Sequence, residues 1–275
     1  MADRENLLIV CCGDGSLHEA WFGPNRSYDI LTIYYGDDPA AAERFRAGSD
    51  IFVALKGLKI ELTRKVLLEE LYFRRGFEFG RYAHIWFPDD DLRFDEGDGG
   101  IEALFAAASA VGADVFQPAV KNENYSESWE STRRIAGAWA HRTNIVEIMA
   151  FGFSGEAFEK AFLAAIHTCE FMKSGWGIEP IWMKIGEAVL RRRLRTFVFD
   201  AVPIVHTRPV GGGASYIHRQ GRYEATYVPQ IHTNRMVTEA VYATLTEAVA
   251  DQSNIIGIDR EKIEQYHAAQ LARFA

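Results

Sequence analysis

The chain has 275 residues, of which 48% are hydrophobic and 25% are charged, proportions typical of a globular protein. Its net charge of −8 argues against a general binder of nucleic acid or of anionic membranes, because both need a basic surface. No run approaches the ~20 apolar residues of a membrane span, and three cysteines are too few for a disulfide framework. We therefore expect a cytoplasmic protein with no transmembrane segment and no nucleic-acid partner.

The first part of the chain alternates apolar runs with turn residues. Residues 7–12, 29–35 and 50–55 are apolar runs of strand length. The first run is apolar on both faces, as in a central parallel strand covered by helices. Asp38 as N-cap and a proline at the next position predict a short helix over residues 39–48.

Polar residues follow each of these runs, where open α/β sheets bind their ligands. Gly13, Asp14 and Ser16 come after the first run, Asp37 after the second and Lys59 after the third. We interpret them as candidate contacts to a nucleotide, with the lysine able to reach phosphate. The glycines do not form a full Gly-x-Gly-x-x-Gly, so an ordinary turn and a solvated lysine are the local alternatives.

A helix is predicted over residues 63–75, and it leads into a buried strand at residues 82–88 that a proline ends. Strand–helix–strand alternation at this spacing predicts an α/β fold with a mainly parallel sheet and right-handed crossovers.

Three carboxylates, Asp89, Asp90 and Asp91, follow that strand directly. If the backbone stays extended, Asp89 and Asp91 point to the same side, about 6.5–7 Å apart. Carboxylates that converge repel one another unless a cation lies between them, and oxygen ligands suit Mg²⁺ or Mn²⁺. The triplet predicts a metal site, with a solvated acidic turn as the alternative.

The middle of the chain predicts a helix at residues 101–111, a short strand at 114–118 and a strand at 143–151. Residues 121–131 are polar and aromatic, and we expect them to form a loop over the site or a surface excursion. The strand at 143–151 carries Glu147 between apolar neighbours, so this acid either lies at a site or faces solvent from an edge strand.

A helix is predicted to begin after Ser154, with a core-facing apolar stripe. Further on, glycines at 175 and 177 flank Trp176, which could stack on a sugar or simply pack the loop. The loop brings Glu179 to the start of a helix at Pro180. Glu179 is a candidate general base, and equally a residue that stabilises the helix N-terminus.

The chain is predicted to divide near a glycine hinge at residues 211–213. Residues 1–213 would form the main domain and residues 214–275 a helical extension. The extension contains two amphipathic patterns, at 237–249 and 259–274, which could pack on the domain or join two subunits of a homo-oligomer.

Six stretches in this order resemble the domain-of-unknown-function family numbered 707, which is similar to a branch of the glycosyltransferases with the GT-A fold. They are Gly-Asp-x-Ser at 13–16, the aspartate triplet, Asp-Val-Phe-Gln-Pro-Ala at 114–119, Thr-Asn-Ile-Val-Glu-Ile-Met-Ala at 143–150, Trp-Gly-Ile-Glu at 176–179 and Asp-Ala-Val-Pro-Ile-Val-His at 200–206. The likeness covers roughly residues 5–210.

The resemblance implies a GT-A-like domain that binds a nucleoside-diphosphate sugar through an Asp-x-Asp motif and Mn²⁺ or Mg²⁺. It assigns the metal to Asp89 and Asp91, with His206 completing the metal shell and Asp90 as the acidic central residue. It also assigns the acceptor-handling acid to Glu179. A proline before the triplet is a modest departure from the family's pattern and leaves the ligand geometry open.

The residues themselves point to the same chemistry. Glycosyl transfer has to stabilise a departing diphosphate, and an acceptor hydroxyl has to lose its proton, for which Glu179 is the first choice of base and Glu147 the second. The leading hypothesis is a metal-dependent glycosyltransferase acting on a glycan acceptor. The alternatives are a divalent-metal phosphohydrolase or nucleotidyltransferase, and a non-catalytic domain that binds a sugar nucleotide or glycan.

Overall fold

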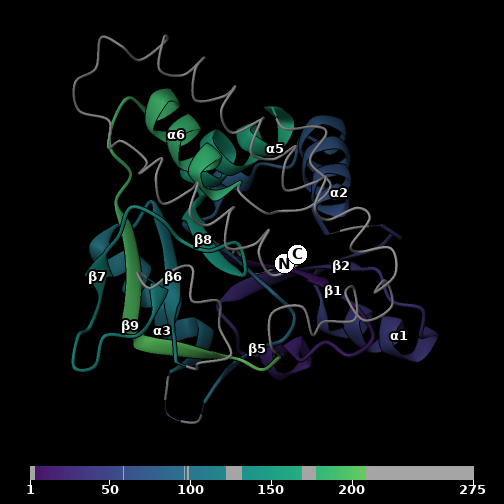
Figure 1. The fold of residues 1–275 in the computed structure, drawn as a ribbon. Helices are drawn as coiled ribbons and strands as arrows, with labels where there is room; N and C mark the ends of the chain where they lie inside the picture. The colour runs from purple at the N-terminus through teal and green to yellow at the C-terminus, as the bar shows by residue number, and fades with distance from the viewer. Residues whose placement is uncertain are drawn as a thin grey trace, which may run out of the picture.

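The computed structural model describes residues 4–57, 59–95, 97, 99–121, 132–168 and 178–208. Within these ranges the fold is α/β, with a curled mixed sheet flanked by helices (Figure 1). The predicted loop after residue 121, Trp176, the glycine hinge and the C-terminal extension lie outside the described residues. No helix in the described ranges is long and apolar enough to cross a membrane.

The described part of the sheet has nine strands. They are β1 (Asn6–Cys12), β2 (Tyr28–Tyr34), β3 (Ile51–Ala54), β4 (His84–Pro88), β5 (Leu92–Phe94), β6 (Val115–Val120), β7 (His141–Arg142), β8 (Ala150–Ser154) and β9 (Thr196–His206). Eight follow the order β3-β2-β1-β4-β8-β6-β9-β5, and β7 pairs with β9. The strands predicted at the start of the chain are confirmed.

The sheet is mixed, so the prediction of a mainly parallel sheet is corrected. Strands β3, β2, β1 and β4 are parallel to one another, and β6 is parallel to β9. Strand β8 runs antiparallel to both β4 and β6, while β5 and β7 run antiparallel to β9.

The sheet curls because β5 lies at the end of the strand order although it follows β4 closely in the chain (Figure 1). Leu92 follows Pro88 by four residue steps, which span at most about 14 Å of extended chain. The edge formed by β5 and β9 must therefore return to the carboxyl end of β4. This curl brings the end of β9 beside the aspartate triplet.

Strand β1 separates two hydrophobic cores. Its odd-numbered residues from Leu7 to Cys11 enter one core and its even-numbered residues from Leu8 to Cys12 enter the other, because successive side chains of a strand point to opposite faces. We name these cores the Phe151 core and the Trp86 core after a member of each. The continuous apolar run of β1 is thereby explained, and both of its cysteines are buried.

The helices cover both faces of the sheet (Figure 1). The Phe151 core takes side chains from α2 (Lys59–Thr63), its π-helical continuation η2 (Arg64–Arg74), α4 (Gly155–Ala157), the π-helical η5 (Phe158–Leu163), α5 (Ala164–Thr168) and α6 (Glu179–Leu190). The Trp86 core takes them from the 3₁₀ helix η1 (His18–Trp21), α1 (Pro39–Gly48) and α3 (Gly100–Val111). A further 3₁₀ turn, η3 (Phe79–Arg81), contributes Phe79 to the Phe151 core.

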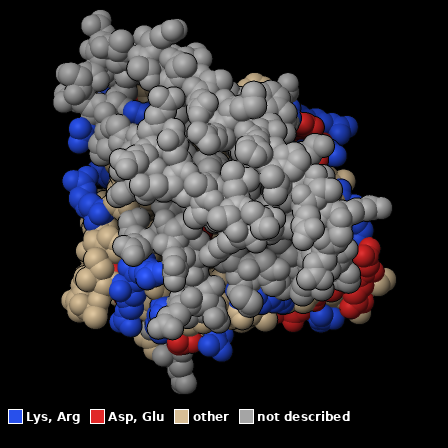
Figure 2. Space-filling model, in the orientation of Figure 1, with Lys and Arg blue, Asp and Glu red and all other residues tan. Residues whose placement is uncertain are grey.

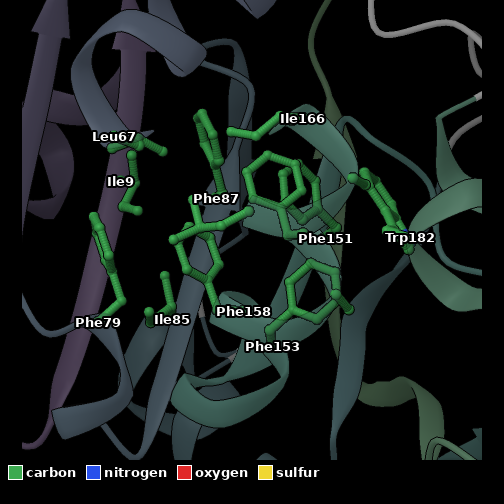
Figure 3. Close-up of a cluster of buried hydrophobic side chains, with 14 of the residues drawn as sticks. Ile9, Leu67, Phe79, Ile85, Phe87, Phe151, Phe153, Phe158, Ile166 and Trp182 are labelled. Carbon is green, nitrogen blue, oxygen red and sulfur yellow. The ribbon is translucent and has the colours of Figure 1, made fainter. Parts of the chain in front are cut away.

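Aromatic rings dominate the Phe151 core (Figure 3). The Phe151 ring lies 4.8 Å from that of Trp182 and 5.0 Å from that of Phe162, measured between centroids. Phe158 and Phe162, predicted as a core stripe, are buried there. Because α6 carries both Trp182 and Glu179, this packing fixes the helix that presents Glu179.

Two predicted helix starts are confirmed by their caps. The Asp38 carboxylate accepts a hydrogen bond from Ala40 N at 2.9 Å, and Ser154 Oγ accepts one from Ala157 N at 3.3 Å. The helix predicted from residue 63 begins earlier, at Lys59, and continues as π-helix. In Figure 2, side chains of Lys and Arg and of Asp and Glu from the described ranges are visible around the margin of this face.

The strand predicted over residues 143–151 is wrong for most of its length, because only Ala150 and Phe151 belong to β8. In the residues before β8, backbone nitrogens donate hydrogen bonds to side chains instead of to a neighbouring strand. Thr143 Oγ1 accepts from Ile145 N at 3.2 Å, and Gln117 Oε1 accepts from Glu147 N at 2.6 Å. Glu147 therefore lies in a loop before β8, and not within a strand.

Candidate functional site

Several of the candidate residues lie at the carboxyl edge of the parallel strands. In the sheet, β2 and β3, which follow β1 in the chain, lie on one side of β1, and the next strand, β4, lies on its other side. Open α/β sheets bind ligands at such a switch point, outside the carboxyl ends of the strands. Gly13–Ser16 follows β1 and the aspartate triplet follows β4, so both predicted loops border this point.

Asp90 joins these two loops. Its carboxylate accepts a hydrogen bond from Gly13 N at 3.1 Å, and its carbonyl accepts one from Leu17 N at 2.8 Å. The chain forms a turn at Asp90 and Asp91, so the assumed extended backbone after β4 is wrong. Asp90 thus holds the two loops together. The prediction that Asp89 and Asp91 point to the same side assumed an extended strand and does not apply to this turn.

Asp14 fastens the loop after β1 to the loop after β2. Its carboxylate accepts hydrogen bonds from the Tyr34 hydroxyl and from the backbone nitrogens of Asp37, at 3.2 Å, and Asp38, at 3.1 Å. The Tyr34 hydrogen bond is the largest of the effects that lower the pKa of Asp14. A Cβ on Gly36 would collide with the Asp14 carboxylate and the Tyr34 hydroxyl, so this close approach requires glycine.

Lys56 is one cation that lies near these loops. Its Nζ lies 2.6 Å from Asp37 Oδ1 and also donates to the carbonyl of Gly36. The predicted phosphate contact Lys59 is the first residue of α2. Asp37 is therefore paired with a neighbouring lysine at this edge.

Asp91 and His206 come together at the end of β9. The Asp91 Oδ1 atom lies 3.4 Å from His206 Nε2, and both residues are buried. Pairing of Leu92 with His206 sets this contact. Thr207 reinforces it, because its N and its Oγ1 donate to the Asp91 carbonyl at 3.1 and 2.7 Å.

The spacing of this pair fits two ligands of one ion. Two atoms each about 2.1 Å from Mg²⁺, at a right angle, are about 3 Å apart. Across the described ranges, no three His, Cys, Asp or Glu side chains are grouped so that they could hold a metal. The structure thus brings Asp91 to His206 and does not group Asp89 with them. The backbone nitrogen of Asp89 instead donates to Met149 O at 2.7 Å.

Arg208 brings a positive charge to the same edge. Its Nη2 donates to the Gly15 carbonyl at 2.8 Å, so the segment after His206 contacts the loop after β1. Sequence reasoning did not select this residue. Its position two residues beyond the histidine was the available signal, since the resemblance had already placed the end of β9 at the site.

Two buried carboxyl groups lie further along the edge. Glu179 is 0% exposed and Glu147 is 8% exposed. Burial first, and the negative charge of Glu179 second, raise the pKa of Glu147 well above its ordinary value. Among the described residues, Glu147 Oε2 has no hydrogen-bond partner.

Backbone contacts connect this pair to the triplet. The loop of Glu147 is held by Gln117, which is fully buried, and Met149 in the same loop accepts from Asp89 N. Gln117 was not selected as a functional residue, although it lies in the Gln-Pro-Ala stretch of the resemblance. Glu179 occupies the first position of α6, after Ile178 as N-cap, so the helix predicted from Pro180 begins one residue earlier and Glu179 is not its N-cap.

Comparison with models of known protein families gives no match for this chain, and comparison with curated proteins gives no relative. The likeness to family 707 stays a prediction, and the case for a function is made from the geometry above.

Proposed function

We propose that the protein is a divalent-metal-dependent glycosyltransferase that uses a nucleoside-diphosphate sugar and a glycan acceptor, on a GT-A-like fold. The observation that carries the proposal is the convergence, at one switch point, of three kinds of group. These are the polar loop after β1, the Asp91–His206 pair with Arg208 nearby, and the buried Glu147–Glu179 pair.

The order of these groups along the edge suggests which part of the substrate each group would contact. The loops after β1 and β2 would contact the nucleoside. Asp91, His206 and Arg208 would meet the diphosphate, because a cation beside the leaving group offsets the charge that develops there. The acidic pair Glu147 and Glu179 would then face the acceptor hydroxyl.

Asp91 and His206 would hold the divalent ion, which supplies Lewis-acid stabilisation of the departing diphosphate when bound. In the transfer, the acceptor oxygen forms a bond to the anomeric carbon, and the bond from that carbon to the diphosphate oxygen breaks with its electron pair on the diphosphate. The acceptor proton passes to a carboxylate, for which Glu179 is the first choice. A buried carboxylate with a raised pKa is a stronger base than a solvated one, which keeps Glu147 as the second choice.

The proposal is tested by calorimetric titration of the full chain with uridine, guanosine, adenosine and cytidine diphosphates, each with and without Mn²⁺. We expect one diphosphate to bind with Mn²⁺ and to lose at least tenfold in affinity on Asp91→Asn. Asp95→Asn is the matched control. It removes an acid four residues away whose carboxylate contacts Arg93 and Lys121 instead of the site, so binding should be unchanged.

A second variant separates binding from chemistry. Glu179→Gln should retain diphosphate binding while the release of diphosphate from the matching sugar nucleotide is lost. If wild type binds no diphosphate with any metal, the transferase proposal fails. If wild type binds a sugar nucleotide and turns none over with any glycan acceptor, the protein is a binding module.

A further inference from the structure

A chain of four polar side chains runs inward from the loop after β1. Ser16 Oγ lies 2.5 Å from His18 Nδ1, His18 Nε2 lies 3.5 Å from Thr32 Oγ1, and Thr32 Oγ1 lies 2.6 Å from Ser49 Oγ. Ser49 Oγ ends the chain by donating to the Phe45 carbonyl at 2.6 Å. Ser16 is partly exposed at the switch point, whereas His18 and Thr32 are fully buried.

The hydrogen positions in this chain follow from its inner end. A carbonyl can only accept, so the single hydroxyl hydrogen of Ser49 is used on Phe45 O. Thr32 must therefore donate to Ser49, and its oxygen then accepts from Nε2–H of His18. This leaves Nδ1 of His18 without a proton, so it accepts the hydroxyl hydrogen of Ser16.

The opposite tautomer is less favourable. With the proton on Nδ1, His18 Nε2 and Thr32 Oγ1 would face each other with lone pairs only, and a buried acceptor would lose its hydrogen bond. Ser16 would then have only the Asp90 carbonyl as an acceptor, at the longer distance of 3.4 Å. Burial lowers the pKa of His18 to about 4, which keeps the ring neutral at physiological pH and makes it a poor base for activating Ser16.

Ser16 Oγ is consequently left with acceptor capacity alone. One of its two lone pairs meets His18 N at 3.3 Å, and the other remains for a ligand. The carboxylates of the surrounding loops are already engaged, Asp14 by Tyr34 and by the backbone of Asp37 and Asp38, and Asp37 by Lys56. With its hydrogen used on His18, Ser16 Oγ cannot donate to a phosphate oxygen and suits a hydroxyl or N–H donor.

We propose that Ser16 accepts a hydrogen bond from a ribose hydroxyl or base N–H of the nucleoside, and that the His18–Thr32–Ser49 chain holds it in this acceptor role. This inference rests on the proposed function, because it assigns one part of the sugar nucleotide to one loop. Ser16 would contact the ligand directly, while His18, Thr32 and Ser49 act as positioning residues.

The orientation is tested first without a ligand, on the full chain labelled with ¹⁵N-histidine and with His18→Gln to assign the signal. We expect the Nε2–H tautomer of His18 from pH 6 to 8. Thr32→Val should shift His18 towards the Nδ1–H tautomer, and Thr32→Ser should restore the wild-type signal. An Nδ1–H tautomer in wild type overturns the inference.

The ligand class is tested by titrating Ser16→Ala with the nucleoside diphosphate that binds wild type and with inorganic pyrophosphate. We expect a loss of roughly fivefold to tenfold for the nucleoside diphosphate and no change for pyrophosphate. Ser109→Ala, an exposed position on α3, is the control and should change neither.

Equal losses on both probes would mean a phosphate contact and would overturn the inference. An unchanged affinity of Ser16→Ala for the nucleoside diphosphate overturns it while the proposed function stands. If wild type binds no nucleoside diphosphate, the proposed function fails and the ligand assignment fails with it, whereas the His18 tautomer is decided independently.

Discussion

Gln117 Oε1 accepts a hydrogen bond from the backbone nitrogen of Glu147 at 2.6 Å, and this contact holds an ionisable side chain inside the protein. The pKa of Glu147 is raised above 4.5, chiefly by burial and then by Glu179. A raised pKa in the folded state means that folding favours the protonated form. The contribution of Glu147 to stability is therefore fully present below about pH 4.5 and is lost as pH rises towards its folded pKa.

Glu147→Gln should remove this pH dependence. We expect the free energy of unfolding of the variant, relative to wild type, to increase as pH rises above about 4.5, by about 1.4 kcal/mol for each unit by which folding raises the pKa. Urea unfolding at intervals from pH 4 to 8 measures the difference. A constant difference over this range would show that Glu147 titrates normally in the folded protein.

Glu179→Gln should lower the pKa of Glu147, because it removes the negative charge that is the second cause of the shift. The loss of stability with rising pH should then be smaller than in wild type. The same urea series measures it. An unchanged slope would mean that burial alone sets the pKa of Glu147, and the two acids would not act as a coupled pair.

Arg208→Ala should weaken binding of inorganic pyrophosphate and of nucleoside diphosphates, because it removes the positive charge beside Gly15. We expect a loss of about fivefold or more in affinity, measured by calorimetry at constant ionic strength. Arg93→Ala is the control, because Arg93 pairs with Asp95 on exposed surface. Equal effects of the two substitutions would indicate a general electrostatic contribution instead of a contact.

The local structure that could be predicted from the sequence depended on strong local signals. Asp38 with Pro39 set the start of α1, and the apolar run of β1 predicted a strand buried on both faces. The strand predicted around Glu147 failed because the Gln117 side chain, distant in sequence, takes the hydrogen bond of that backbone. A hydrogen bond between a side chain and a backbone group thirty residues away produces no periodic pattern in the sequence.

Part of the candidate site could also be predicted from the sequence. The meeting of Asp91 with His206 was expected from the resemblance, and the contact arises from the pairing of β5 with β9. Periodicity could not supply it, because β5 has only three residues and its place depends on the curl of the sheet. The chain through His18 was missed because a single histidine between a leucine and a glutamate carries no distinguishing local pattern.

Asp114→Asn should destabilise the fold. Asp114 is buried, and burial alone would raise its pKa, but hydrogen bonds from Arg192 and from Arg195 N and Nε outweigh it and lower the pKa. A lowered pKa means stability that is present above the unfolded value near 3.9 and is lost as pH falls through the folded pKa. The variant should lose about 2–3 kcal/mol at pH 7 and converge towards wild type in acid.

The control for that variant is Glu70→Gln, which alters an exposed ion pair with Arg74 and Arg75 and should change stability little. Unfolding by urea at pH 7 and pH 3 compares the two. A comparable loss in both variants would mean that the partly exposed arginines screen Asp114 as effectively as solvent does, and its burial would contribute nothing specific.

Gly36→Ala should disrupt the loops at the switch point, because its Cβ would occupy the space of the Asp14 carboxylate and the Tyr34 hydroxyl. Relieving that overlap requires breaking the Asp14–Tyr34 hydrogen bond, so we expect a loss of about 1–3 kcal/mol in the free energy of unfolding. The affinity for a nucleoside diphosphate should fall as well, since Asp14 also positions the backbone of Asp37.

Gly23→Ala is the matched control, because its Cβ would meet nothing within 4 Å, and it should leave both stability and affinity near wild type. Urea unfolding and calorimetry on the same preparations separate the two effects. If Gly36→Ala lowers stability without changing affinity, the Asp14–Tyr34 contact supports the fold alone, and the nucleoside does not depend on the loop that this contact fastens.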